Sequence, residues 1–212
     1  MTVSFHKYGD YFPGTGNIAD VGVDEGKYYS VNFPLNDGIS DDMFLMAFKP
    51  VLTEVMHRFK PETIYMQCGT DSLCGDRLGL FNLSIRGHGE AVKFTKSFGI
   101  PMVLLGGGGY TLRNVARCWT YETSVALGVE IENEIPENEY SLYYHPSNKI
   151  HVTVSNQENL NTREDIELNT KRILDNLKQV RVSGVDYSYY HNGTPCEKVP
   201  TLSNIMGLDQ SE

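Results

Sequence analysis

The sequence predicts an α/β fold in which a mostly parallel sheet is flanked by helices. Two short apolar runs, residues 63–68 and 101–105, have the length of buried strands, and segments with helical spacing follow at residues 84–98 and 114–127. Parallel strands need such a crossover, because the chain has to return to the same end of the sheet. We therefore expect these two strands to lie side by side.

A second pair of strands comes earlier in the chain. Residues 2–5 form a β-type run, a loop rich in glycine, proline and aromatic residues follows, and residues 27–33 form a strand that Pro34 is expected to close. Residues 40–59 then show the spacing of a helix, in which Pro50 is expected to cause a break or a kink.

The last part of the chain changes in composition. Residues 129–162 are irregular and polar, residues 163–179 form one more amphipathic helix, and the sequence beyond this helix is polar. We therefore expect one domain at residues 1–180, followed by a polar and flexible tail at residues 181–212.

The composition argues against several classes of protein. The net charge is −9, whereas nucleic-acid binding needs a basic field, so we expect no direct sequence-specific DNA binding. None of the four cysteines forms a CxxC pair, which argues against a structural zinc knuckle. The sequence shows no apolar run of membrane-spanning length and no signal peptide, so we expect no membrane association and a reducing compartment.

Two polar side chains follow the predicted strands at the edge where ligands bind. In open parallel sheets, ligands bind at the edge formed by the carboxyl ends of the strands. Asp71 follows the first of the two predicted strands, and Tyr110 follows the second. A carboxylate at this edge can bind zinc, although it can also cap the segment that follows. A phenol can donate a hydrogen bond to a developing oxyanion, although the ring can also be a packed aromatic.

Four glycines, residues 106–109, stand between the second apolar strand and Tyr110. Without side chains, the backbone can approach a ligand closely or adopt positive φ. A phosphate cradle at a helix N-terminus is the alternative, but GGGGYTLRN contains neither GxGxxG nor a P-loop with its Lys-Ser/Thr pair. A tight turn alone would need only one or two of the glycines.

Four longer motifs carry a resemblance to a known family. They are YFPGTGNIADVG, KYYSVN, QCGTDSLCGDRLGLFNLSIRGHG and LGGGGYTLRNVARCWTYET, in the family's order. From Thr2 to about Lys178 the sequence closely resembles the class I histone deacetylases. The resemblance implies the arginase–deacetylase fold, with zinc at the carboxyl ends of the strands. It also implies hydrolysis of N6-acetyl-lysine on histone tails, and thus transcriptional repression, in the nucleus and also in the cytoplasm.

The resemblance implies roles for individual residues. Asp71 matches a zinc-binding aspartate, and Tyr110 matches the tyrosine that polarises the acetamide carbonyl and stabilises the tetrahedral oxyanion. The family residues that line the tunnel for the acetyl-lysine stem correspond here to Phe12, Leu78, Gly107 and Gly108. The ligands of structural potassium (K+) ions are matched by Ser4, Phe5 and Tyr29. The inositol-phosphate site, at which class I enzymes meet their corepressor subunits, is matched by Arg77 and Arg113, although each arginine alone would be a surface charge.

One part of the family's site has no match in this sequence. The family binds zinc (Zn2+) with an Asp-x-His pair besides the aspartate that Asp71 matches, and it uses two adjacent histidines in catalysis. This sequence has six histidines, of which no two are adjacent and none forms Asp-x-His. We therefore expect the C-terminal part of a catalytic domain, incomplete at the N-terminus and inactive alone. The alternative is a genuinely short, inactive module that binds corepressor or inositol phosphate.

Overall fold

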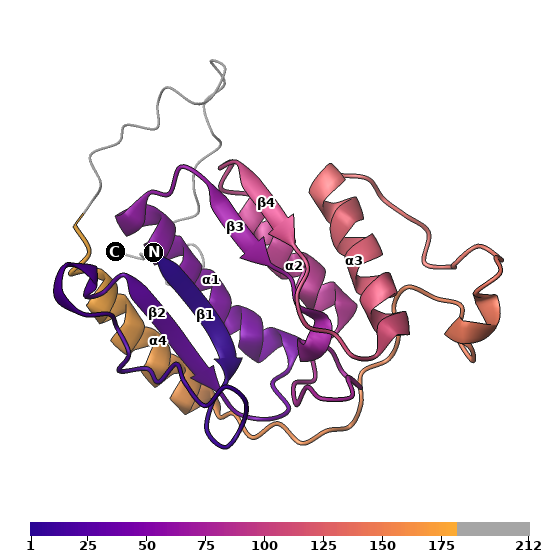
Figure 1. Cartoon of the computed structure of the whole chain (residues 1–212), viewed down its shortest axis with the longest axis horizontal. Coiled ribbons are helices and arrows are strands. Elements are labelled where there is room, and N and C mark those ends of the chain that lie inside the picture. Colours follow the sequence, from indigo (N-terminus) through magenta and orange to yellow (C-terminus); the bar gives the residue numbers. More distant parts are fainter. Residues whose placement is uncertain (182–212) are drawn as a thin grey trace, which may run out of the picture.

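The computed structural model describes residues 1–181 of the 212-residue chain, and strands and helices alternate along this part (Figure 1). Of the predicted tail, residues 181–212, all but Arg181 lie outside the described residues. The strands are β1 (Thr2–Lys7), β2 (Ser30–Leu35), β3 (Ile64–Gln67) and β4 (Met102–Leu105). The α-helices are α1 (Asp41–Phe59), α2 (Ile85–Lys96), α3 (Leu112–Leu127) and α4 (Arg163–Leu177), and the short 3-10 helices are η1 (Asp24–Gly26), η2 (Thr70–Ser72) and η3 (Ser141–Tyr144).

The strands of the described part form two separate parallel pairs. β1 pairs with β2, with Val3 opposite Val31, and β3 pairs with β4, with Ile64 opposite Met102. All four strands point in the same direction (Figure 1). The predicted α/β class is therefore confirmed, and so is the prediction that the strands on either side of α2 are neighbours.

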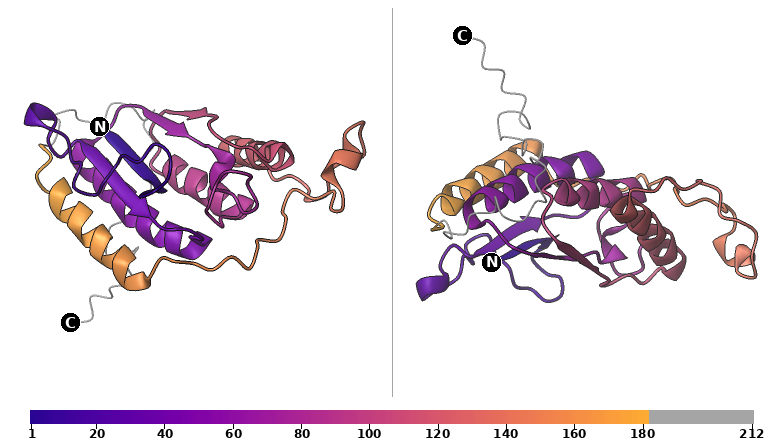
Figure 2. Two further views of the ribbon diagram at one scale, coloured as in Figure 1. Left: turned by 60° about the horizontal axis from the view of Figure 1, so that its bottom comes forward. Right: turned by 90° about the horizontal axis from the view of Figure 1, so that it is seen from above.

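The largest core cluster lies between the β1–β2 pair and the helices α1 and α4, which cover one side of these strands (Figure 2). Full burial of one large apolar side chain stabilises a fold by about 1.5–3 kcal/mol, so this cluster fixes the strand pair on the helices. Its buried members include Val31, Phe33, Leu35, Ile39, Ala47, Val51, Val55, Ile166, Ile173 and Leu177.

The β3–β4 pair is covered on one side only. Less and more exposed residues alternate along both strands, and the side chains of Tyr65, Val103 and Leu105 are 72%, 40% and 47% exposed. The prediction that both apolar runs are buried strands is therefore wrong for this face. An apolar run indicates a strand, but it does not say whether a second layer covers it.

Two prolines depart from the prediction. Pro34 lies inside β2 and does not end it. Since β2 has a strand partner on one side only in the described residues, its outer edge tolerates the missing N–H. Pro50 lies inside α1 and does not break this helix. A proline inside a helix costs about 3 kcal/mol, and α1 offsets this cost by burying neighbours such as Ala47 and Val51.

Residues 129–162 are irregular apart from η3, as predicted. Arg117 of α3 ties this segment to the domain, because its buried guanidinium donates hydrogen bonds to the carbonyl oxygens of Tyr144, Ser147 and Lys149 at 3.1, 2.6 and 2.8 Å. Among the described helices, none combines the length and the apolar character needed to cross a membrane.

Candidate functional site

The candidate site lies where the chain leaves the carboxyl ends of β3 and β4. The backbone N–H of Thr70 in η2 donates a hydrogen bond to the carbonyl oxygen of Gly108 at 2.7 Å, which joins the two loops. A Cβ atom at Gly108 would collide with the carboxylate oxygen Oδ2 of Asp71, and one at Gly107 would collide with the amide of Gln67. The positive φ that the glycines allow is found at Gly109, and Gly107 and Gly108 let side chains of the β3 loop pack against the backbone, whereas a close approach to a ligand stays a prediction.

Asp71 is a half-buried carboxylate that lines an open cavity of about 690 Å³ between the two strand pairs. Burial raises the pKa of its carboxyl group, and the negative charge of Asp76 raises it further. The backbone of Asp71 itself and the nearby His88 act in the opposite direction. No other residue of the described part donates a hydrogen bond to this carboxylate. Asp71 is therefore aimed at the cavity with its acceptor capacity largely unused.

Asp76 holds the loop that carries Tyr110. Its Oδ2 atom accepts hydrogen bonds from the backbone N–H groups of Tyr110 and Thr111 at 2.7 and 3.2 Å. Its Oδ1 atom accepts from Leu78 and Gly79 at 2.9 and 3.0 Å. Burial alone would raise the pKa of Asp76, but the four N–H groups bring it below its usual value. The capping role considered for Asp71 therefore belongs to Asp76.

The side chain of Tyr110 projects from this loop. The residue is 45% exposed, and the phenol makes no hydrogen bond or ring contact with another residue of the described part. This exposure does not fit a packed aromatic. The phenol is free to meet a ligand at the edge that also holds Asp71.

The apolar residues expected around a substrate lie on adjoining loops. Phe12 and Leu78 are 89% and 58% exposed. The hydroxyl of Tyr11 donates a hydrogen bond to the carbonyl oxygen of Leu78 at 3.0 Å, and so holds the two loops together. Burial raises the pKa of Tyr11, with further contributions from the charges of Asp71 and Asp76, so this hydroxyl keeps its proton.

Two arginines flank the same loops. Arg77 and Arg113 are both exposed, and neither forms an ion pair with another residue of the part that the structure describes. The hydroxyl of Thr111 donates to the carbonyl oxygen of Gly75 at 2.9 Å, which brings the two segments that carry the arginines together. Both guanidinium groups are thus available to an anion.

A family model, described as the histone deacetylase domain, matches residues 1–126. The chain belongs to the histone deacetylase family. It is 57% identical to human histone deacetylase 1 over 180 residues and 59% identical to histone deacetylase 1 of Oryza sativa subsp. japonica over 181 residues. It is 54% identical to type-1 histone deacetylase 1 of Dictyostelium discoideum over 180 residues. These matches cover 85% of this chain but only 37%, 35% and 36% of the three relatives.

The family implies a zinc hydrolase, and Asp71 is suited to bind zinc because its carboxylate accepts no hydrogen bond from any other described residue. A catalytic zinc site takes about three protein ligands, however. Within residues 1–181 the one group of three potential metal donors is formed by His88, Cys118 and Glu122, and it does not include Asp71. The described residues therefore offer a single candidate zinc ligand at this edge and do not complete a zinc centre.

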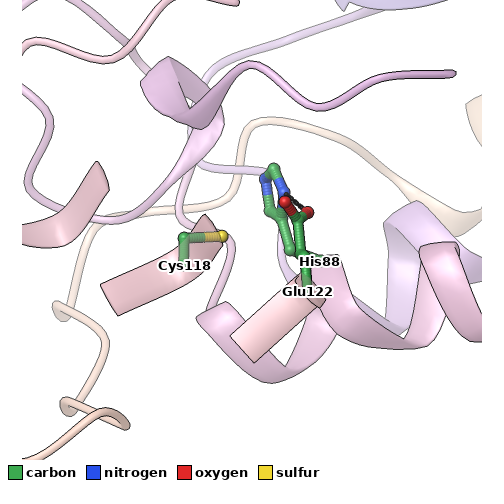
Figure 3. A group of neighbouring side chains, drawn as sticks. All are labelled: His88, Cys118 and Glu122. Carbon is green, nitrogen blue, oxygen red and sulfur yellow. Dashed lines mark hydrogen bonds and ion pairs between the residues drawn. The ribbon is translucent and has the colours of Figure 1, made fainter. Parts of the chain in front are cut away.

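The donors of the His88 group are of the types that zinc takes, but His88 and Glu122 already bond to each other (Figure 3). Nδ1 of His88 lies 3.1 Å from Oε1 of Glu122, and Nε2 lies 2.6 Å from the hydroxyl of Ser72. Cys118 is fully buried, and burial raises the pKa of its thiol far above the usual range. A buried neutral thiol and a fully engaged imidazole describe a structural cluster better than a metal site.

Of the residues expected to bind potassium, Ser4 and Phe5 line the same cavity as Asp71, from the other strand pair. Ser4 and Phe5 are in the middle of β1, where the hydroxyl of Ser4 is 2.7 Å from Nδ1 of His6. Tyr29 precedes β2, and its carbonyl oxygen accepts a hydrogen bond from Thr2 at 3.0 Å. Their roles as potassium ligands stay predictions, as do the roles of the zinc, substrate and inositol-phosphate residues.

Four residues of the site were missed by reasoning from sequence. Asp76 lies in the turn-like stretch CGDRLG, where an aspartate beside glycine is a signal for backbone capping. Ser72, His88 and Glu122 have no local signal, because they stand on η2, α2 and α3 and meet only when these elements pack.

Proposed function

We propose that residues 1–181 form part of a zinc-dependent lysine deacetylase that removes the acetyl group from N6-acetyl-lysine on histone tails in the nucleus. One observation carries this proposal. In a member of the histone deacetylase family, a half-buried carboxylate without other donors, Asp71, lies against the glycine backbone that leads to an exposed phenol, Tyr110. Asp71 is the group with which this chain would hold the metal.

Tyr110 is the proposed catalytic residue of this chain. Its phenol donates a hydrogen bond to the acetamide oxygen, and this bond strengthens as the oxygen gains negative charge in the tetrahedral transition state. The interaction therefore favours the transition state over the bound substrate, which is what raises the rate. The freedom of the phenol from other hydrogen bonds in the described part supports this role.

The loops beside Tyr110 are proposed to form the substrate tunnel. Phe12 and Leu78 supply apolar surface for the methylene stem, and Gly107 and Gly108 leave room for it. An apolar tunnel favours neutral acetyl-lysine over lysine, because burial of an unpaired ammonium group is costly. Acetylated histone tails are accordingly the proposed substrates.

Arg77 and Arg113 are proposed to bind inositol phosphate at a contact with corepressor subunits. Their exposure and their lack of ion pairs in the described part support this role. The same two arginines would be the working residues of the alternative function, a short module that binds corepressor or inositol phosphate without catalysis. The two functions differ in one measurable property, the ability of Asp71 to take part in a zinc site.

The test compares this chain with a hybrid enzyme. The hybrid joins the chain to the part of human histone deacetylase 1 that precedes the matched segment. We expect the chain alone to bind no stoichiometric zinc and to release no acetate from an acetyl-lysine peptide, because one carboxylate does not hold catalytic zinc. We expect the hybrid to bind one zinc ion and to be inhibited by a hydroxamate.

Metal analysis and the peptide assay decide between the outcomes. Zinc and hydroxamate-sensitive turnover in the chain alone would contradict the incomplete zinc site. A folded hybrid that binds inositol phosphate but no zinc would contradict the deacetylase function and favour the binding module.

A further inference from the structure

A hydrogen-bond relay lines the same cavity as Asp71. It runs from the hydroxyl of Ser72 in η2 to Nε2 of His88 in α2 at 2.6 Å, and from Nδ1 of His88 to Oε1 of Glu122 in α3 at 3.1 Å (Figure 3). The side chains of His88 and Glu122 are 11% and 4% exposed. Three elements that are far apart in the sequence thus meet through polar atoms inside the domain.

The chemistry of the three groups gives the relay a direction. An unprotonated carboxylate only accepts hydrogen bonds, so Nδ1 of His88 carries the proton that faces Glu122. With that proton on Nδ1, Nε2 accepts the hydroxyl proton of Ser72 at 2.6 Å, in preference to the carbonyl oxygen of Gly69 at 3.2 Å. Every member is satisfied in this arrangement, which a buried polar network requires if it is to hold its atoms in place.

The relay reaches η2 at the residue next to Asp71. η2 has three residues and no side-chain cap. Its other bonds are weak ones, because the Ser72 oxygen lies 3.2 Å from the carbonyl oxygen of Gly69 and the N–H of Leu83 donates to the carbonyl oxygen of Ser72 at 3.3 Å. On one side Thr70 is held by the carbonyl oxygen of Gly108, and on the other side Ser72 is held by His88. Asp71 lies between these two anchors, and its own carboxylate contributes no third anchor.

We propose that Ser72, His88 and Glu122 are positioning residues that hold η2 so that the Asp71 carboxylate faces the cavity. This inference rests on the proposed function, since it assigns the relay to the zinc ligand of that function. It gives the buried Glu122, which has no other partner in the described part, a place in the site.

The same order of groups, serine, histidine and acid, occurs in enzymes that use serine as a nucleophile. Here the neighbouring residue is the carboxylate of Asp71, whose negative charge would oppose an oxyanion formed beside Ser72. A positioning role is therefore favoured over a nucleophilic one. Reaction with a fluorophosphonate probe separates the two.

The first measurement uses this chain and does not depend on zinc. Ser72→Ala removes the hydroxyl, and Glu122→Gln removes the acceptor charge. Ser124→Ala is the matched control, because Ser124 is a buried serine of α3 whose hydroxyl bonds only within its own helix, to Tyr121. The amide of Leu73 closes η2 and the amide of Thr70 joins it to Gly108, and we expect both protons to exchange at least about tenfold faster in the two relay variants and unchanged in the control.

The second measurement uses the hybrid enzyme. Loss of a group that orients a metal ligand typically weakens metal binding about 10–100-fold. We expect that loss of zinc affinity in Ser72→Ala and Glu122→Gln, with a lower kcat and an unchanged KM, whereas Ser72→Thr, which keeps a hydroxyl, restores most of the affinity. A purely structural role would lower the melting temperature of the relay variants and the control alike, with zinc affinity unchanged.

The outcomes are separable. Unchanged exchange at Thr70 and Leu73 in both relay variants would overturn the inference, whatever the hybrid does. Normal zinc affinity of these variants in an active hybrid would also overturn it. If the fluorophosphonate probe labels the wild-type chain and Ser72→Ala abolishes this labelling, a nucleophilic role of Ser72 would replace the positioning role. A wild-type hybrid without zinc would instead count against the proposed function alone.

Discussion

Replacement of Asp76 by asparagine tests how the loop beneath Tyr110 is held. The two carboxylate oxygens accept four backbone N–H groups, two from Tyr110 and Thr111 and two from Leu78 and Gly79. Asparagine has the same shape but one acceptor oxygen, so two of the four donors would face an NH₂ group. A hydrogen bond to a charged group contributes about 1.5–3 kcal/mol, and water can replace part of it at this half-buried position. We expect the free energy of unfolding to fall by about 1.5–3 kcal/mol at pH 7.

The pH dependence of this effect has a definite sign. The pKa of Asp76 is lowered from 3.8 in the folded chain, so its contribution is present above pH 3.8 and is lost as the pH falls through the folded value. Urea unfolding of both proteins at pH 7 and at successively lower pH should show the difference shrinking below pH 3.8. Asp10→Asn, at an exposed aspartate without such bonds, is the control. A difference under about 0.5 kcal/mol, or one independent of pH, would refute the reasoning.

Three further predictions concern the hybrid enzyme. Asp71→Asn should weaken zinc binding and abolish activity, because a neutral amide oxygen is a poorer zinc ligand than a carboxylate; normal zinc content and rate would leave Asp71 without this role. Tyr110→Phe should lower kcat about 10²–10³-fold with zinc content and melting temperature unchanged, and a nearly normal kcat would remove the phenol from catalysis. Gly108→Ala should displace the Asp71 carboxylate, which is the flexible group that a new Cβ would meet, and so reduce zinc affinity more than stability; chelator competition and thermal unfolding measure the two.

The parts of the site that sequence could predict depend on local periodicity and one rule about parallel sheets. The apolar runs placed β3 and β4, and the rule placed Asp71 and Tyr110 at their carboxyl ends, where the structure finds both. The four glycines predicted a backbone with positive φ or close approach to a ligand, and Gly109 has positive φ. Each of these inferences needs only the order of residues along a short segment.

The parts that sequence could not predict depend on packing between distant segments. His88 and Glu122 are 34 residues apart and meet because α2 packs on α3. Pro34 fits within β2 because β2 has one strand partner in the described part. The sequence near Pro34 does not show how many partners the strand has. The exposure of Tyr65 was not predictable for a similar reason. A short apolar sequence indicates a strand but does not show whether one or two layers cover it.

The two strand pairs have a consequence for how this chain behaves in solution. Within residues 1–181, β1 and β3 each have a strand partner on one side only, and the apolar side chains of Tyr65, Val103 and Leu105 lie on an open face. Backbone groups at such edges are templates that any extended polypeptide can join, including a second copy of the same chain. The chain is therefore expected to stay dispersed when dilute and to assemble as its concentration rises. Because the joining groups are peptide N–H and C=O, substitutions of Asp71 or Tyr110 would leave this tendency in place.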